Sequence, residues 1–450
     1  MQLFPFVGCS LLWIASLVLA QANGSDQQSN GVDFDNRFTV ETRNCYKVLT
    51  NNILNERYAL VSCNVTDDLS GYQAVVQVPV KRVGVTNALD ILPLFELLAQ
   101  QNIVVSVTPA ANVTSPCYGN FTNGSVDVMF MDQPVRNNNS TDQTPIVGVS
   151  SSSTDLHPLE KAAWIMYIAQ FLDAETDATS IMHNIKMDYN CNKANIASAG
   201  NLSLAWTYYD AGKREWSLLG DRYHSSLTLD AGFTSAVDGT RKFTNISDLH
   251  EAMKGIQYVI DVTPLENLNS EQSASYSDWL RLGGFLPGQD AFTEPFRDYR
   301  QMFRMDGLVN DEGYSDWPER SAARPDLVLR DMIQMAYPTY DQQYRATWMR
   351  NFAKSTSVKT VSETTYPSCS DPIKRLTVCK SGVYKPSPSD TGDSGDNDSS
   401  NPKSGLSTGG KVGIAIGVIA GVAGAGVAGF FLYRRKQSSG TRPFYKMNDL

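Results

Sequence analysis

An unbroken apolar run near the C-terminus is the feature that most constrains the organisation of this chain. Residues 412–433 read VGIAIGVIAGVAGAGVAGFFLY and are followed by the basic cluster Arg434–Lys436. A helix of this length crosses a hydrocarbon core of roughly 30 Å. Because the basic residues follow the run, the positive-inside bias places the tail 434–450 in the cytosol. The sequence therefore predicts one transmembrane helix over 411–433. The charged tail argues against a glycosylphosphatidylinositol signal, which ends in apolar residues.

The N-terminus favours the same topology. Residues 11–20 (LLWIASLVLA) are apolar but too short to span a bilayer, and Ala20-Gln21-Ala22 offers a signal-peptidase site. We expect a signal peptide over 1–22 and a type I, single-pass protein of the plasma membrane, with its ectodomain outside the cell.

Composition indicates an ordinary globular ectodomain on a stalk. The chain is 42% hydrophobic and 10% aromatic, which is enough to bury a sizeable core. Its net charge of -9 leaves no basic footprint, so nucleic acid is excluded as a partner. Residues 384–410 are mostly Ser, Gly, Asp, Asn and Pro, and this composition predicts a disordered stalk. The ectodomain should end near residue 383.

The cysteines indicate an oxidising compartment. Removal of Cys9 with the signal peptide leaves six cysteines, an even number that favours disulfides. Six cysteines allow fifteen pairings, among which the sequence does not choose. Local closure favours Cys45 with Cys63 and Cys369 with Cys379, which leaves Cys117 for Cys191.

Many N-glycosylation sequons point to the secretory route. The sites expected to carry glycans are Asn64, Asn112, Asn120, Asn201 and Asn245, and further sequons begin at Asn23, Asn123, Asn138, Asn139 and Asn397. Their density suggests a glycosylated surface.

Short apolar strands alternate with helical stretches through the N-terminal part, 30–157. Buried strands are expected at 82–86, 103–108, 126–131 and 145–150, with a helix at 88–100. This βαβ pattern predicts an α/β lobe. Before it, 46–49 and 58–63 should form a hairpin that a disulfide between Cys45 and Cys63 would hold.

The strongest helical signal lies in the middle of the chain. Apolar residues recur every three or four positions over 158–189, Pro158 suits the first turn, and Glu160 suits the positive helix end. One helix of this length would be roughly 48 Å long and could bridge two lobes. We therefore predict an interlobe helix over 158–190.

The α/β alternation then restarts. Strands are expected at 202–208 and 257–262, and helices at 222–229 and 247–255. The predicted fold class is thus α/β, with two α/β lobes joined by one long interlobe helix, the second lobe being 191–383, plus a single C-terminal transmembrane helix. Two lobes on one helix leave a cleft at the carboxyl ends of their strands, where open α/β sheets bind ligands.

Four segments in this order resemble the class III periplasmic binding proteins, the iron-siderophore, cobalamin and metal-binding receptors of bacterial ABC importers. The segments are RVGVTNALDILPLFELL (82–98), PLEKAAWIMYIAQFLDAETDATSIMHNIKMDY (158–189), LAWTYYDAGKREWSLLGDRYHSSLTLDAGF (204–233) and DWPERSAARPDLVLRDMIQMAYP (316–338). The resemblance implies two lobes on a long helix, a ligand between them and limited hinge motion. A transmembrane helix and many sequons depart from that family and put delivery to an ABC importer in doubt.

Residues at the strand ends are the candidate ligand contacts. The ligand-binding set is Thr86, Asn87, Asp132, Gln133, Tyr208, Tyr209, Asp210, Trp216 and Arg222, with Thr108, Tyr223, Asp261, Trp279 and Trp317 as further candidates. Aromatic area, hydroxyls and one Arg suit a bulky polar ligand or an anionic chelate.

Motif analysis gives little support to catalysis or metal binding. A GxSxG match at 405–409 falls in the predicted stalk and a GxGxxG match at 424–429 falls in the predicted transmembrane run, outside the α/β lobes where such motifs act, and the chain has no HExxH or P-loop motif. Its four histidines, His157, His183, His224 and His250, are not paired at metal-ligand spacing. We expect no enzyme activity, no cofactor and no direct metal site.

The leading hypothesis is a cell-surface protein that captures an extracellular small molecule, an iron chelate or related metal complex according to the resemblance. The alternative is an adhesion or sensing glycoprotein whose cleft has lost its ligand. In the membrane helix, Gly413, Gly417 and Gly421 fall on one face at a spacing that suits a homodimer.

Overall fold

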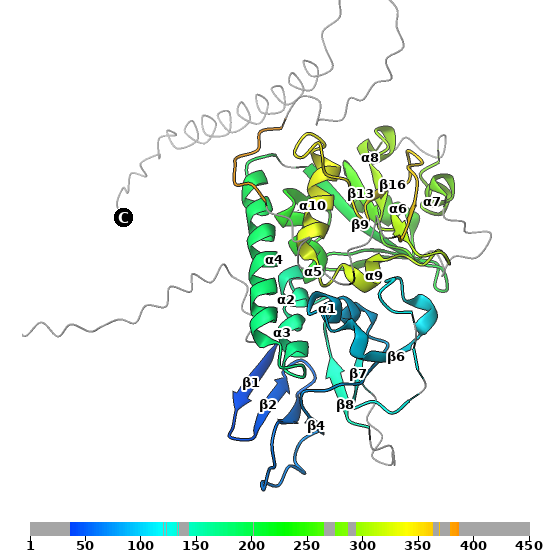
Figure 1. The fold of residues 1–450 in the computed structure, drawn as a ribbon. Coiled ribbons are helices and arrows are strands. Elements are labelled where there is room, and N and C mark those ends of the chain that lie inside the picture. The colour runs from blue at the N-terminus through cyan, green and yellow to red at the C-terminus, as the bar shows by residue number, and fades with distance from the viewer. Residues whose placement is uncertain are drawn as a thin grey trace, which may run out of the picture.

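The structure is a computed structural model that describes residues 37–119, 121–122, 124–132, 134, 144–200, 202–264, 275–286, 294–362, 369 and 379–386. Two mixed α/β lobes lie against one column of helices (Figure 1). The predicted signal peptide, transmembrane helix with its glycine face, and cytosolic tail lie outside these residues. In the part that is described, no helix is long and apolar enough to cross a membrane.

The first lobe begins with a small, mostly antiparallel sheet. Within the described residues its order is β1 (Phe38–Thr42), β2 (Tyr46–Asn51), β3 (Glu56–Val61) and β4 (Ala74–Gln77). The predicted hairpin is confirmed as β2 and β3, which pair in antiparallel register from Tyr46 opposite Val61. A disulfide between Cys45 and Cys63 closes its open end, as predicted.

A parallel sheet forms the rest of this lobe. Its described strands run in the order β6 (Val104–Thr108), β5 (Val83–Thr86), β7 (Val128–Asp132) and β8 (Ile146–Val149), and all neighbours are parallel. These are the four predicted strands. The predicted helix at 88–100 is shorter and consists of η1 (Leu89–Ile91) and α1 (Leu92–Leu97), followed by η2 (Gln101–Ile103). A further short helix, η3 (Ala110–Asn112), follows β6.

The long interlobe helix is divided, which corrects the prediction of one helix over 158–190. The segment forms α2 (Pro158–Ala162), α3 (Trp164–Ala169) and α4 (Glu175–Ile196). In a continuous helix the carbonyl of Phe171 would accept from the amide of Glu175, but it accepts instead from the amide of Val80 in the first lobe at 2.9 Å. Asp173 then adopts a left-handed conformation with φ 56°. The three helices still form the column beside both lobes (Figure 1).

The second lobe is built on a larger mixed sheet. Its described strands are β12 (Arg241–Phe243), β10 (Glu215–Leu218), β9 (Leu202–Asp210), β13 (Tyr258–Asp261), β14 (Met302–Arg304) and β16 (Arg350–Asn351), in that order, with β11 (Phe233–Ser235) also pairing with β9. A separate pair joins β15 (Leu308–Val309) to β17 (Lys359–Thr360). The helices are α5 (Arg222–Asp230), α6 (Ile246–Ala252), α7 (Tyr276–Leu282), α8 (Pro295–Asp298), α9 (Trp317–Arg320) and α10 (Pro325–Ala336). The two strands and two helices predicted here are confirmed within a few residues.

Side-chain alternation along β9 explains how this sheet is covered on both faces. Leu204 and Trp206 belong to a hydrophobic cluster that runs into the helical column and the first lobe. Ala205 belongs to a second cluster, which includes Trp216 and Trp279 and fills the opposite face. Successive strand residues point to opposite faces, so an uninterrupted apolar strand is what a sheet buried on both sides requires.

Two of the predicted disulfides are wrong. Cys117 pairs with Cys369 and Cys191 pairs with Cys379, across sequence separations of 252 and 188 residues. The last described segment, 379–386, packs along the C-terminal end of α4, where the amide of Cys379 donates to Asp188 at 2.6 Å. The carbonyl of Cys369 accepts instead from Gln101 in the first lobe. The two cysteines that are close in sequence therefore lie against different parts of the fold.

The packed domain reaches slightly further than the predicted boundary near 383. Tyr384 lies in edge contact with the rings of Tyr337 and Tyr340, at centroid distances of 5.6 and 5.4 Å. Its amide also donates to the carbonyl of Asn195. The stalk predicted from residue 384 therefore begins with a residue that packs on α4 and α10.

Candidate functional site

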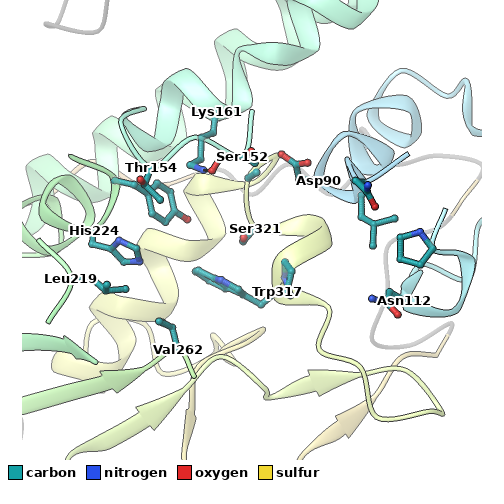
Figure 2. Close-up of a pocket in the computed structure, with 16 residues that line it drawn as sticks. Asp90, Asn112, Ser152, Thr154, Lys161, Leu219, His224, Val262, Trp317 and Ser321 are labelled. Carbon is teal, nitrogen blue, oxygen red and sulfur yellow. Dashed lines mark hydrogen bonds between the residues drawn. The ribbon is translucent and has the colours of Figure 1, made fainter. Parts of the chain in front are cut away.

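A cleft between the two lobes is the candidate site. It has a volume of about 590 Å³, within the range of roughly 300–1,000 Å³ that is usual for small-molecule sites. Figure 2 shows side chains from both lobes around it. The first lobe and α2 contribute Asn87, Leu89, Asp90, Pro109, Asn112, Ser152, Thr154 and Lys161, and the second lobe contributes Leu219, Tyr223, His224, Val262, Trp317, Pro318, Ser321 and Ala322.

The cleft lies where parallel strands end. After β5 the chain turns through Asn87, a residue with φ 52°, into η1, and this turn brings Asp90 to the cleft. Asn112 in η3 follows the end of β6, and Val262 follows the end of β13 in the other lobe. The carboxyl ends of parallel strands leave loops and helix starts facing outward, so polar groups gather there.

Lys161 on α2 supplies a buried ammonium at one side of the cleft. Its Nζ donates to the carbonyls of Ser151 at 3.1 Å and Ser152 at 2.8 Å, and lies 4.7 Å from the centre of the Tyr223 ring. Burial lowers the pKa of Lys161 to about 8, while the carboxylates of Asp90, Asp221 and Asp132 oppose that decrease. The ammonium is thus already held by protein oxygens and an aromatic face.

Two buried carboxylate oxygens nearby have no hydrogen-bond partner among the described residues. They are Oδ2 of Asp90 and Oδ1 of Asp132, and we refer to them as the acceptor cluster; the buried hydroxyl of Ser151 beside Asp90 can donate as well as accept. Burial raises the pKa of Asp90, with Ser151 and Lys161 opposing the increase, and burial also raises the pKa of Asp132. In Figure 2 the Asp90 carboxylate points toward Ser152 and Lys161, into the cleft. A buried acceptor without a partner is costly, so this corner favours a donor.

The opposite wall carries a carboxylate–histidine pair. Asp221 is the N-cap of α5 and accepts from the amide of His224, while Nδ1 of His224 lies 2.9 and 2.8 Å from its two carboxylate oxygens. Burial acts to raise the pKa of Asp221, but the contacts with His224 outweigh it and lower that pKa. With Nδ1 donating to Asp221, the other ring nitrogen of His224 is the one left for a ligand.

Trp317 on α9 forms the aromatic wall, and a carboxylate fixes that helix to the first lobe. Oε2 of Glu319 accepts from the amide of Thr114 at 2.6 Å and from its hydroxyl at 2.9 Å. Oε1 accepts from the amide of Ser115 at 3.3 Å. Glu319 is buried, and burial raises its pKa to about 8, with repulsion from Asp316 and Glu96 adding to the increase. The position of Trp317 thus depends on a bond between the lobes.

Of the predicted ligand-binding residues, the structure brings Asn87 into the cleft, together with the further candidates Tyr223 and Trp317. Asp132 lies beside it and lines a smaller cavity of about 210 Å³ that shares Ser152 with the cleft. Gln133 lies outside the described residues. The remaining predicted contacts, Thr86, Tyr208, Tyr209, Asp210, Trp216 and Arg222, are not among the cleft-lining residues.

Four of these outlying residues have another role. Tyr209 and Trp216 pack in the second hydrophobic cluster, and Asp210 is paired with Lys213 at 2.6 Å. Arg222 binds Glu160 with both guanidinium nitrogens, at 2.7 and 3.1 Å. Because Glu160 is buried in α2, this bidentate pair joins α2 to α5 and turns Arg222 away from the cleft.

The sequence interpretation missed Asp90, Asn112, Ser152, Lys161, His224 and Ser321. Asp221 directly before the predicted helix at 222–229 was a usable N-cap signal for His224. Asn112, predicted only as a glycan site, lies at the cleft. Asn64 and Asn245 are exposed, whereas Asn120 and Asn201 lie outside the described residues. Across the described ranges, no group of three or more His, Cys, Asp or Glu could hold a metal ion.

Comparison with known proteins gives distant structural likenesses. No protein-family model and no curated protein matches the chain. An ABC transporter substrate-binding protein from Listeria monocytogenes has 11% identity and a TM-score of 0.40, covering 58% of this chain and 100% of that one. A possible iron-binding, periplasmic solute-binding protein from Staphylococcus epidermidis has 12% identity and a TM-score of 0.41, covering 58% and 99%.

A periplasmic heme-binding protein from Pseudomonas aeruginosa has 11% identity and a TM-score of 0.41, covering 60% of this chain and 97% of that one. These neighbours are substrate-binding proteins, the group that the sequence segments resemble. Scores of this size do not establish a shared fold or ligand. Any function must rest on the cleft itself.

Proposed function

We propose that this protein is a solute-binding protein that holds a small molecule between its two lobes. The observation that carries the proposal is the cleft of about 590 Å³ at the strand ends, lined from both lobes by Trp317, Tyr223 and convergent polar groups. Such a mixture of aromatic area and a few oriented polar groups is typical of ligand sites. The chemistry is binding rather than covalent turnover.

The alternative, a surface glycoprotein with a degenerate cleft, predicts that side chains fill the space between the lobes. The open volume and the unpartnered oxygen of Asp90 favour a ligand instead. A glycan on Asn112 would favour the alternative, because it would occupy the cleft that Asn112 lines.

A ligand screen should raise the melting temperature of the full-length protein. At a ligand concentration of 100 times Kd, mass action adds about 2.7 kcal/mol to stability. Iron-siderophore complexes, cobalamin and haem are the first compounds to test, since the sequence resemblance predicts an iron chelate or related metal complex. Free metal ions serve as the comparison.

The site is then tested by substitution. Trp317→Ala should reduce the ligand-induced shift, measured against the variant's own ligand-free melting temperature. Tyr208→Ala, at a half-buried residue outside the cleft, is the matched control and should retain the full shift. If Trp317→Ala leaves the shift intact, or if no compound in a broad library produces one, the proposal is wrong.

We also propose that the ectodomain faces the outside of the cell, anchored by the predicted helix at 411–433. In intact cells, external protease should remove ectodomain epitopes and spare an epitope fused after Leu450, because the basic cluster Arg434–Lys436 holds the tail inside. Peptide N-glycosidase should reduce the apparent mass of the protein. A tail epitope that is cleaved from outside contradicts this topology.

A further inference from the structure

The charges around the cleft indicate which ligands it selects, an inference that rests on the proposed function and deepens it. Among the described lining residues, Lys161 is the one Lys or Arg, and its ammonium already has two carbonyl partners. Arg222, the cation expected there from the sequence, is bound to Glu160. An anionic ligand would therefore find no uncommitted guanidinium in this lining.

Acceptors, in contrast, are in excess. Asp90 lines the cleft with a buried oxygen that has no partner among the described residues, and the acceptor cluster adds Oδ1 of Asp132. Asp90 and Asp132 are close enough to raise the energy of each other's charge, so a second cation beside them would relieve that repulsion. The hydroxyl of Ser152 donates to Asp132 at 2.9 Å but uses the other carboxylate oxygen, Oδ2, and leaves Oδ1 open.

Apolar surface lies beside this acceptor corner. Leu89 stands one residue before Asp90 in η1, and α9, which carries Trp317, contacts η1 from the second lobe. Trp317 is held in place by edge contact with Trp348 at 5.5 Å. An indole face attracts cations and packs against flat apolar groups, so it suits both parts of an amphipathic amine.

We propose that the cleft binds a small organic cation, an ammonium group on an apolar or aromatic body. Asp90 accepts hydrogen bonds from the ammonium, and Trp317 and Leu89 contact the body. This class differs from the anionic chelate suggested by the residue types in the sequence.

Three probes that differ mainly in charge test this proposal with the full-length protein. They are 2-phenylethylamine, 2-phenylethanol and 3-phenylpropanoate, and titration calorimetry or tryptophan fluorescence measures binding. The amine should bind roughly 10- to 100-fold more tightly than the alcohol, the effect expected of a charge-assisted hydrogen bond to a buried carboxylate. The propanoate should bind most weakly.

Asp90→Asn keeps the shape of the side chain and removes its charge. It should bring the affinity for the amine down to that for the alcohol, while binding of the alcohol changes little. Asp210→Asn is the matched control, because Asp210 is paired with Lys213 outside the cleft, and the preference for the amine should persist. Melting curves of both variants check that the fold is retained.

The pH dependence gives a second readout that does not need a variant. The groups facing Asp90 are Lys161 from α2, Asp132 from the end of β7 and the hydroxyl of Ser151. Protonation of Asp90 removes the acceptor charge, so affinity for the amine should fall as pH decreases, while affinity for the alcohol stays level. The loss should begin at a higher pH than for an ordinary aspartate, because burial raises the pKa of Asp90.

The outcomes separate the two proposals. Tighter binding of the propanoate, equal binding of all three probes, or a preference for the amine that survives Asp90→Asn overturns the cation proposal and leaves solute binding intact. Binding of the iron chelates without binding of the amine likewise overturns the cation proposal and leaves solute binding intact. If neither the chelates, the library nor any probe binds, both proposals are overturned.

Discussion

Asp331→Ala should destabilise the protein by roughly 3–5 kcal/mol, one of the largest effects expected of a single substitution. The buried carboxylate of Asp331 on α10 accepts from the amides of Thr347, Trp348 and Met349, at 2.9, 2.7 and 3.1 Å, and from the hydroxyl of Tyr344 at 2.6 Å. Alanine leaves three backbone amides without this acceptor, two of them buried, those of Trp348 and Met349. Urea unfolding of the full-length protein measures the loss.

Asp331→Asn should fall between wild type and alanine, because the amide retains one acceptor oxygen. Asp311→Ala is the control, since Asp311 is exposed, and should change stability by less than about 0.5 kcal/mol. Equal stability of Asp331→Ala and wild type would show that these amides find other acceptors. The same substitution should weaken ligand binding, because Trp348 supports Trp317 and donates to Asp316.

Glu319→Gln should flatten the dependence of stability on pH. Burial raises the pKa of Glu319 from 4.5 to about 8 in the folded state, so the folded protein holds this proton more tightly than the unfolded chain. The stability contributed by protonated Glu319 is thus complete below about pH 4.5 and is lost as pH rises toward 8. Glutamine cannot ionise, so it removes this loss.

Between pH 5 and pH 8 the free energy of unfolding of wild type should therefore fall by roughly 3 kcal/mol more than that of Glu319→Gln. The slope of stability against pH is the diagnostic quantity. Glutamine also places its side-chain NH2 group near the amide of Ser115, which lowers stability by the same amount at every pH. Urea unfolding at several pH values measures both. Glu312→Gln, at an exposed site, should leave the slope of wild type unchanged. Parallel curves for Glu319→Gln and wild type would contradict the expectation.

This pH dependence concerns the cleft as well as the fold. Glu319 connects α9 to Thr114 in the first lobe, and its neighbours are Asp316, paired with Arg320 at 2.6 Å, and Glu96. Ionisation of Glu319 adds a second buried negative charge beside Asp316. We expect the wall that carries Trp317 to be held most firmly at mildly acidic pH.

Local sequence patterns were enough to predict many of the secondary-structure elements. Two short neighbouring strands at 46–49 and 58–63 predicted a hairpin, and local closure predicted its disulfide between Cys45 and Cys63. The four strands of the parallel sheet in the first lobe, and β9 and β13 in the second, were equally readable, since strands buried on both faces form short apolar runs. Sequence neighbours interact in these elements, so sequence distance approximates spatial distance.

Contacts between segments that are distant in the sequence could not be predicted from local patterns. The helical period continued through 170–174, yet the carbonyl of Phe171 accepts from the amide of Val80 in the first lobe, between the end of α3 and the start of α4. Arg222 was predicted to contact a ligand, but it binds Glu160, which lies 62 residues away in the sequence. The disulfides of Cys117 and Cys191 close across the fold for the same reason.

By itself, then, the sequence determined the central strands of both lobes, the helices α5 and α6, the hairpin disulfide and an expectation of two lobes with a cleft at their strand ends. Only the tertiary structure decided which side chains face that cleft. Whether a residue lines the cleft depends on the direction of its side chain and on how η1, α2, α5 and α9 pack against one another. Asp90, Lys161, His224 and Trp317 come from four such segments, and no local pattern records that they converge.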